Sequence, residues 1–180
     1  MESMLFTPVT FGPLTLRTRT IRSAAFESMC PGNAPSDMLL DYHRSVAAGC
    51  IGMTTVAYAA VTQSGLSFDR QLWMRPEIIP GLRRLTDAIH AEGAAAGIQL
   101  GHCGNMSHKS ICGCMPVGAS SGFNLYSPTF VRGLRADELP EMARAYGRSV
   151  NLAREAGFDS VEIHAGHGYL ISQFLSLIHI

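Results

Sequence analysis

Apolar residues recur at helical spacing in three segments of the chain, and a glycine closes or follows each one. The segments are residues 36–49, 76–93 and 137–157. Ser36 stands where a helix N-cap is expected, and Pro76 suits the first turn of a helix, where its missing N–H leaves no bond unmade. Because the apolar positions in each segment fall three or four residues apart, we predict three amphipathic helices, each with one buried face.

Short apolar runs of strand length lie before and between these helices. The runs are residues 20–26, 51–57, 96–101 and 161–164, and a small hairpin is predicted ahead of them at 11–18, around a glycine-proline turn. Each run is too short for a helix, and glycine or proline lies near most of them. The chain is therefore expected to alternate strand and helix four times.

Two further segments lie outside these strands and helices. Residues 101–135 are rich in Gly, Ser, Pro and Cys and show no sustained period, so they predict a long loop of the kind that carries function or closes over a site. Residues 168–176 predict the start of a fourth helix.

The alternation of strands and helices predicts parallel strands joined by right-handed crossovers. Such an order fits either a doubly wound sheet or a barrel. Gly97, Gln99 and Gly101 share one face of the third strand, and Glu162 shares a face with His164 in the fourth. Polar inner faces favour the barrel, because strands of an open parallel sheet are apolar on both faces. Four β/α units are half of a (β/α)8 barrel.

The end of the fourth strand carries the clearest candidate for a functional site. His164, His167 and Tyr169 lie within six residues and are separated by glycine and alanine, where the strand runs out into a loop. Side chains from several parallel strands converge at that end of a barrel. We therefore expect the two imidazoles and the phenol to meet one ligand atom.

Composition and charge narrow the class of protein. The chain has 180 residues, 47% of them hydrophobic, which is enough for one domain with a buried core. Its 14 basic and 14 acidic residues cancel, so charge gives no support for binding to nucleic acid or to a membrane surface. The first residues lack a signal-peptide pattern, and the five cysteines lack a zinc-ribbon spacing. We expect a reduced, cytoplasmic protein that acts on a small molecule, with homo-oligomerisation left open.

Five stretches follow one another in a specific order that covers essentially the whole chain. They are Leu5-Phe6-Thr7-Pro8, residues 20–26, 97–102 and 116–121, and the stretch 157–176. In this order they resemble the Old Yellow Enzyme family of NADH:flavin oxidoreductases, the FMN-dependent ene-reductases that include 2,4-dienoyl-CoA reductase-like members. The resemblance implies a TIM barrel, of which residues 1–180 would be the N-terminal portion of a single FMN-binding domain, with the C-terminal half absent.

The resemblance also implies which residues form the site. The expected FMN contacts are Ser23, Ala24, Ala25, Phe26, Ala60 and Gln99. His164 and His167 would hold the carbonyl oxygen of an α,β-unsaturated substrate, and Tyr169 would donate the proton. The implied reaction is reduction of an activated C=C bond, in an enone or an enoyl thioester, with NAD(P)H as the hydride donor and FMN as the cofactor.

The chain departs from the family pattern at three places. The family commonly has arginine where this chain has Asn105, and many members have cysteine or threonine at the position of Phe26. After Ser176 the family continues with proline and four more strands, whereas this chain has residues 177–180. Because the flavin-phosphate loops of the family lie in those later strands, and because half a barrel leaves sheet edges exposed, we expect the 180-residue chain to bind FMN weakly or not at all.

The sequence is also compatible with two other functional hypotheses. A metal-dependent barrel hydrolase could use His102, His164 and His167 as ligands, because barrels bring histidines together at one rim. Alternatively, the chain is a non-catalytic truncated product that associates with another chain. Of these residues, His102 is expected chiefly to stabilise the long loop.

Two further features have structural interpretations. Cys112-Gly113-Cys114 suggests a metal or redox site, but no second pair completes a set of four ligands, so we interpret these cysteines as unpaired loop thiols. Glu162, if it points inward, is expected to pair with a basic side chain such as Arg22.

Overall fold

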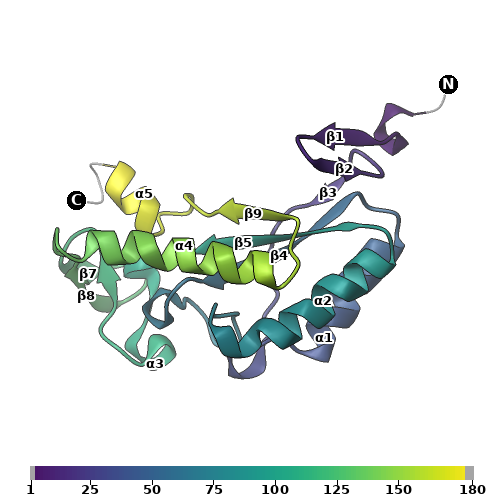
Figure 1. The fold of residues 1–180 in the computed structure, drawn as a ribbon. Helices are drawn as coiled ribbons and strands as arrows, with labels where there is room; N and C mark the ends of the chain where they lie inside the picture. The colour runs from purple at the N-terminus through teal and green to yellow at the C-terminus, as the bar shows by residue number, and fades with distance from the viewer. Residues whose placement is uncertain (1–2, 177–180) are drawn as a thin grey trace.

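The structure, a computed structural model that describes residues 3–176, begins with a small β-hairpin set apart from the main sheet (Figure 1). A short 3₁₀ turn, η1 (Met4–Phe6), precedes strands β1 (Val9–Phe11) and β2 (Leu14–Leu16), which pair antiparallel. Gly12 turns the chain between them with a φ of +54°, a value that favours glycine. The predicted hairpin is therefore present, shifted slightly toward the N-terminus.

Four parallel strands form the main sheet, in the order β3-β4-β5-β9 (Figure 1). The strands are β3 (Ile21–Arg22), β4 (Met53–Ala60), β5 (Ala95–Gly101) and β9 (Ser160–Ile163). Strands that follow one another in this sheet are neighbours, as in consecutive β/α units of a barrel. The predicted alternation of strand and helix is confirmed, and the sheet is a partial barrel that ends at β3 on one side and at β9 on the other.

The helices connect these strands and cover them. They are α1 (Asp37–Ala48), α2 (Ile79–Ala91) and α4 (Leu139–Glu155), followed by the short α5 (Leu170–Leu175). α1 packs against β4, α2 and α4 pack against β5, and α1 lies beside α2 beneath the sheet in Figure 1. As predicted, the Ser36 side chain caps α1 by accepting a hydrogen bond from the Leu39 N–H. Short 3₁₀ turns occur at η2 (Pro31–Asn33), η3 (Gln63–Gly65), η4 (Pro76–Ile78) and η5 (Gly104–Met106).

The hydrophobic core lies between the long helices and the sheet. Side chains from α1 and α2 and from β4 and β5 are fully buried there, and they include Leu39, Val56, Leu82, Ile89 and Ile98. Burial of each such side chain contributes roughly 1.5–3 kcal/mol. This packed layer holds the strands in register and so fixes the position of their carboxyl ends, where the candidate site lies.

The segment predicted as a long loop at 101–135 has secondary structure of its own, so that prediction is wrong. It contains α3 (Lys109–Cys112) and a small sheet of β6 (Val117–Gly118), β7 (Gly122–Asn124) and β8 (Thr129–Gly133), in the order β6-β8-β7. Phe123 and Phe130 face each other across the β7-β8 pair with ring centroids 5.1 Å apart. Strands of this length are too short to produce a period in the sequence, which explains the error.

The first strand of the main sheet is much shorter than the predicted 20–26. β3 pairs with β4 only at Ile21 and Arg22, because side chains bond the β4 backbone beyond that point. The Arg22 guanidinium donates to the Thr55 carbonyl oxygen (2.6 Å), and a Glu27 carboxylate oxygen accepts from the Ala57 N–H (3.2 Å). The backbone after Arg22 therefore leaves the sheet, and the following residues become available to line a cavity.

The two edges of the main sheet are open within residues 3–176. β9 is an edge strand, and Ile163 on it is 45% exposed although it is apolar. In the part of the chain that the structure describes, no helix has the length and apolar character needed to cross a membrane.

Candidate active site at the carboxyl ends of the strands

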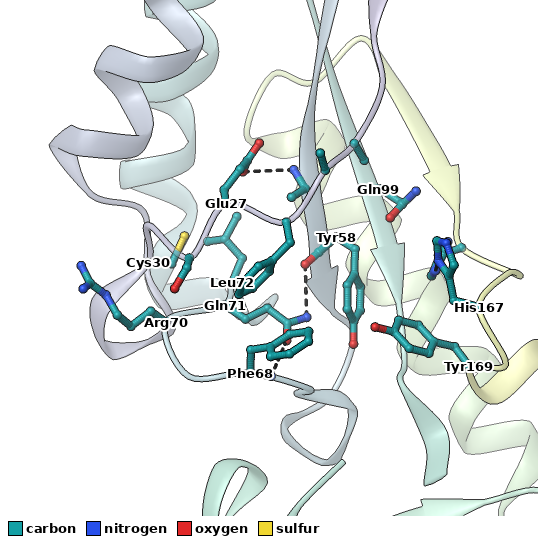
Figure 2. Close-up of a pocket in the computed structure, with 16 residues that line it drawn as sticks. Glu27, Cys30, Tyr58, Phe68, Arg70, Gln71, Leu72, Gln99, His167 and Tyr169 are labelled. Atoms are coloured by element: carbon teal, nitrogen blue, oxygen red, sulfur yellow. Dashed lines mark hydrogen bonds between the residues drawn. The ribbon is translucent and has the colours of Figure 1, made fainter. Parts of the chain in front are cut away.

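A cavity of about 190 Å³ lies at the carboxyl ends of the parallel strands (Figure 2). Its walls come from the segment after β3, from β4 and the loop that follows, from β5, and from the loop after β9. The lining residues are Ala24, Ala25, Phe26, Glu27, Ser28, Cys30, Ala57, Tyr58, Phe68, Arg70, Gln71, Leu72, Gln99, His164, His167 and Tyr169. Figure 2 shows Gln99, His167 and Tyr169 at one end of the cavity and Cys30 and Arg70 at the other.

Most of the site residues expected from the sequence lie together in this cavity. Those that line it are Ala24, Ala25, Phe26, Gln99, His164, His167 and Tyr169. Ser23 is exposed outside it, and Ala60, the last residue of β4, is fully buried in a cluster with Leu66 and Cys112. The register of β4 against β5 shifts between Val56 and Ala59, so alternation counted along β4 fails at this point. Ala57 and Tyr58 are the β4 residues that line the cavity instead.

The side chains of His164, His167 and Tyr169 gather around one point. The ring centroids of His164 and His167 are 4.9 Å apart, and those of His164 and Tyr169 are 5.0 Å apart. Nδ1 of His167 lies 3.0 Å from Nε2 of His164, so one imidazole donates a hydrogen bond to the other. In a neutral pair this bond uses one of the two ring N–H groups, which leaves one donor for a ligand. A ligand oxygen that accepts from both rings must therefore replace the bond between them.

Burial sets the protonation of these groups. It lowers the pKa of His164, an effect that the nearby His167 reinforces and Glu162 opposes. Burial also raises the pKa of the Tyr169 phenol. His164 is thereby favoured as a neutral imidazole near pH 7, and Tyr169 keeps its proton, so both can act as neutral hydrogen-bond donors.

The backbone of the loop after β9 is held in an unusual conformation. His167 has a φ of +57° and is followed by Gly168 at +67°. A left-handed conformation costs energy in a residue other than glycine, and such strain persists where surrounding contacts impose it. The constraint here is Gln173 on α5, which is 1% exposed and donates from Nε2 to the Gly168 carbonyl oxygen (2.7 Å) and to the Asn105 side chain (2.9 Å). Gln173 could not be recognised from the sequence, because nothing in its context distinguishes it from a glutamine on the surface of a helix.

Close packing between strands places Tyr58 beside the histidine pair. Its ring centroid is 5.9 Å from that of His164 and 5.4 Å from that of Tyr169, and its hydroxyl donates to the Gly65 carbonyl oxygen (2.6 Å). A Cβ on Gly101 would lie 2.7 Å from the Tyr58 ring and 3.2 Å from the His164 Cβ. Glycine at position 101 therefore makes room for both side chains, a role that the sequence pattern of β5 did not reveal.

Gln99 lies beside Glu162 on the adjacent strand, and its Nε2 donates to a Glu162 carboxylate oxygen. The expected pairing of Glu162 with Arg22 is wrong, because β3 and β9 are at opposite edges of the sheet. Arg22 instead pairs with Glu27 (2.6 Å). Since the Gln99 amide donates to Glu162, its carbonyl oxygen remains available as an acceptor.

A buried carboxylate at Glu27, in the wall of the cavity, links three elements. One oxygen accepts from Arg22 and lies 3.0 Å from His43 Nε2 on α1, and the other accepts from the β4 backbone at Ala57. His43 is fully buried and bonds Thr54 through its other nitrogen (2.8 Å). Neither residue was predicted from the sequence, because His43 falls on the face of α1 that is spaced for burial and Glu27 belongs to no recognisable pattern.

His102 is not part of the cavity. Its Nδ1 accepts a hydrogen bond from the Gly104 N–H (3.0 Å), so its proton is on Nε2, which donates to the Ser64 hydroxyl (3.1 Å). Burial lowers the pKa of His102 to about 4. The expected role in stabilising the loop fits these bonds. In residues 3–176 no group of three or more His, Cys, Asp and Glu side chains could hold a metal ion, so the hydrolase alternative gains no support.

The fold and the site together define a class of protein, namely one built on the first four units of a TIM barrel, with a cluster of imidazole, phenol and amide groups at the carboxyl ends of its strands. The NADH:flavin oxidoreductase / NADH oxidase family matches residues 4–179. The chain belongs to this family.

Relatives and solved structures agree with this assignment. The chain is 41% identical to the 4,4'-dithiodibutanoate disulfide reductase of Rhodococcus erythropolis, over 96% of this chain and 43% of the relative. It is 33% identical to the NADPH dehydrogenase of Bacillus subtilis (strain 168), over 98% of this chain and 52% of the relative. The chain therefore spans about half the length of these relatives.

Among solved structures, the Old Yellow Enzyme homologue of Zymomonas mobilis superimposes with a TM-score of 0.89 at 26% identity, over 97% of this chain and 52% of the other. A 2-naphthoyl-CoA reductase in complex with 2-naphthoyl-CoA gives a TM-score of 0.93 at 25% identity, over 99% of this chain and 30% of the other. The described fold is thus a partial TIM barrel that corresponds to about half of the Old Yellow Enzyme homologue.

Proposed function

We propose that this chain is the N-terminal portion of an FMN-dependent oxidoreductase that reduces an activated C=C bond with NAD(P)H. The observation that carries the proposal is the gathering of His164, His167 and Tyr169 near Gln99 at one end of a single cavity. Membership of the NADH:flavin oxidoreductase family supports the choice of flavin and nicotinamide cofactors. In this proposal residues 1–180 form the N-terminal portion of one FMN-binding domain.

The cavity wall suits a flat flavin ring. Ala24, Ala25 and Ala57 present small side chains along it, and the Gln99 carbonyl oxygen offers an acceptor for a ring N–H. We keep Ala24, Ala25, Phe26 and Gln99 as proposed FMN contacts and place Ala57 in the role first given to Ala60. Bound FMN would supply hydride transfer, the chemistry that the side chains themselves cannot perform.

The polar groups at the end of the cavity would then act on the substrate. His164 and His167 would donate N–H groups to the substrate carbonyl oxygen, on which negative charge develops as hydride reaches the β-carbon. The bond between the two imidazoles would be exchanged for bonds to that oxygen. Tyr169 would transfer its phenolic proton to the α-carbon, a step that requires the protonated phenol favoured by its raised pKa.

The substrate class that fits this arrangement is an alkene conjugated to a carbonyl group, such as an enone or an enoyl thioester. A structural neighbour named morphinone reductase, solved with tetrahydroNAD, has a TM-score of 0.89 at 26% identity. The neighbouring 2-naphthoyl-CoA reductase was solved with its thioester. Both names support a conjugated small molecule as substrate.

A second candidate reaction is reduction of a small disulfide that carries carboxylates. The relative named 4,4'-dithiodibutanoate disulfide reductase, at 41% identity, favours it. Hydride would go to one sulfur, the S–S bond would break, and a proton would go to the other sulfur, which yields two thiols. Arg70 lines the opposite end of the cavity from Tyr169, and within residues 3–176 its guanidinium has no hydrogen bond or ion pair, so it could receive a carboxylate.

The test uses a full-length barrel that contains residues 1–176 of this chain, because the 180-residue chain is expected to retain little FMN. This protein is reconstituted with FMN without oxygen, reduced with NADPH and mixed with 2-cyclohexenone. Reoxidation of the flavin, followed by its visible absorbance, is the expected result. Tyr169→Phe removes one hydroxyl and should slow that reoxidation by about a hundredfold or more while leaving reduction by NADPH unchanged. Equal slowing of both half-reactions would contradict the role of Tyr169. Reoxidation by 4,4'-dithiodibutanoate but not by 2-cyclohexenone would favour the second candidate.

We also propose a cytoplasmic location and leave the assembly state to measurement. The support for a reducing compartment is that all five cysteines are free thiols in the structure. No nucleic-acid or membrane partner is proposed, because the formal net charge is zero. Sedimentation of the purified protein would decide between a monomer and a homo-oligomer.

A further inference from the structure

Two thiols lie in contact outside the candidate active site. Sγ of Cys114 is 3.6 Å from Sγ of Cys112, and the Cys112 thiol donates to the Cys114 carbonyl oxygen (3.2 Å). The residue between them, Gly113, has a φ of +71° and ends α3 by reversing the chain. This left-handed turn, which favours glycine, places both sulfurs on the same side.

The two sulfurs differ in their access to solvent. Cys112 is fully buried in a small apolar cluster with Ala60 and Leu66, whereas Cys114 is only partly buried at the edge of that cluster. A small reagent can therefore reach Cys114 first, and Cys112 is held where it can attack the product. One accessible thiol beside one protected thiol is the arrangement that intramolecular thiol–disulfide exchange requires.

Cys112 and Cys114 make the only sulfur-to-sulfur contact in residues 3–176, although Cys103 is near enough to Cys112 to be affected by its charge. Cys30 and Cys103 are buried, and burial raises the pKa of each to about 12, which makes them poor nucleophiles. Cys50 is exposed, and no other sulfur contacts it within the part of the chain that the structure describes. The chain therefore contains one preformed dithiol and, in Cys50, an internal standard for an accessible single thiol.

We propose that Cys112 and Cys114 form a redox-active dithiol that closes to an intramolecular disulfide by exchange with a small-molecule disulfide. The Cys114 thiolate attacks one sulfur of R–S–S–R, so that a mixed disulfide forms and the first R–S⁻ leaves. The Cys112 thiolate then attacks Sγ of Cys114 and expels the second R–S⁻. The two cysteine protons end on two R–SH molecules, the cysteines are oxidised by two electrons, and the small disulfide is reduced by two.

The ring that this bond closes is small, and strained disulfides of this kind are readily reduced again. Burial first, and then its neighbour Cys112, raise the pKa of Cys114 to about 11, so the exchange is slow at neutral pH. The disulfide between Cys112 and Cys114 would link the end of α3 covalently to the segment that precedes β6, and β6 pairs with β8. The site is thus a reversible covalent link within the small sheet beside the cavity, and it is independent of the proposed flavin chemistry.

The test treats the reduced 180-residue chain with mixtures of glutathione disulfide and glutathione at pH 8.5, followed by acid quenching and mass analysis. Trypsin cuts after Lys109 and Arg132, and the peptide 110–132 holds both cysteines and no other. The expected result is loss of two hydrogens from this peptide with no glutathione attached. Cys112→Ser should instead leave one glutathione on Cys114, and Cys50→Ser should leave the internal bond unchanged.

Sequence proximity alone could favour closure, so the equilibrium is also measured in 6 M guanidinium chloride. If the native turn presents the sulfurs to each other, the equilibrium constant for closure should be at least tenfold higher in native buffer than in denaturant. The proposal is overturned if the two constants agree, if peptide 110–132 carries glutathione and no internal bond, or if it stays reduced while Cys50 becomes glutathionylated.

Discussion

At the scale of single residues, protonation follows from burial. His102 and His164 are pushed toward the neutral form, and Tyr169 keeps its proton. Burial has different consequences for the active-site residues and for His102. At Tyr169 and His164 it favours donors aimed at a ligand, whereas at His102, which bonds only protein groups, it makes the fold sensitive to acid.

The acid sensitivity of His102 can be predicted with its sign. Its pKa falls from 6.5 in the unfolded chain to about 4 in the folded protein, so between these values the unfolded state binds a proton that the folded state does not. Stability is therefore lost as the pH falls from 6.5 toward 4, by about 3 kcal/mol in total. Urea unfolding at pH 7.5 and pH 4.5 should show a smaller loss in His102→Asn than in the parent chain.

The matched control for this prediction is His90→Asn, which removes a partly exposed imidazole on α2. This variant should keep the acid sensitivity assigned to His102. An identical pH dependence in the parent chain and in His102→Asn would show that His102 is not its source.

At the scale of elements, side chains replace backbone pairing at the start of the main sheet. β3 is short because Arg22 and Glu27 bond the β4 backbone, and this exchange frees the segment after β3 to form one wall of the cavity. Glu27 also reaches α1 through His43. One carboxylate therefore fixes the position of β3, β4 and α1 relative to one another.

Removal of the Glu27 carboxylate should lower the free energy of unfolding. Glu27→Ala leaves Arg22 and the fully buried His43 without their partner and frees the Ala57 N–H, so we expect a loss of about 3 kcal/mol in the free energy of unfolding. Urea denaturation followed by circular dichroism measures it. Glu27→Gln keeps the shape and one acceptor and should lose clearly less. A loss below about 1 kcal/mol in Glu27→Ala would mean that the network is not coupled to folding.

At the scale of the whole molecule, the described sheet is half of a closed barrel. In residues 3–176 the strands β3 and β9 are open edges, and the apolar Ile163 on β9 is exposed. The relatives that the chain matches are about twice as long. The cavity is thus walled by one half of a barrel, and a flavin held there would lie against one wall only.

We therefore expect the 180-residue chain to retain little FMN. The expected result is that FMN added in excess separates from the protein on gel filtration, with far less than one flavin per chain by visible absorbance. The exposed edges should also bind a hydrophobic dye. Stoichiometric flavin in the protein peak would overturn this expectation and would show that the described half forms a sufficient site.

The amino-acid sequence by itself determined the alternation of strands and helices, the caps at Ser36 and Gly49, and the grouping of His164, His167 and Tyr169 at the end of a strand. These features are local, because a spacing of 3.6 or 2 residues and the capping hydrogen bond of the Ser36 side chain act within a few residues of each other. All the residues that determine such a local feature are close together in the chain, so the feature can be predicted from the sequence.

Only the tertiary structure decided which distant groups meet. The register shift in β4 brought Ala57 and Tyr58 to the cavity, the order of strands separated Glu162 from Arg22, and the turn at Gly113 brought the free thiols of Cys112 and Cys114 into contact. The physical reason is common to all three cases. Contacts between strands and across turns depend on register and on backbone φ values, which no periodicity in the sequence records.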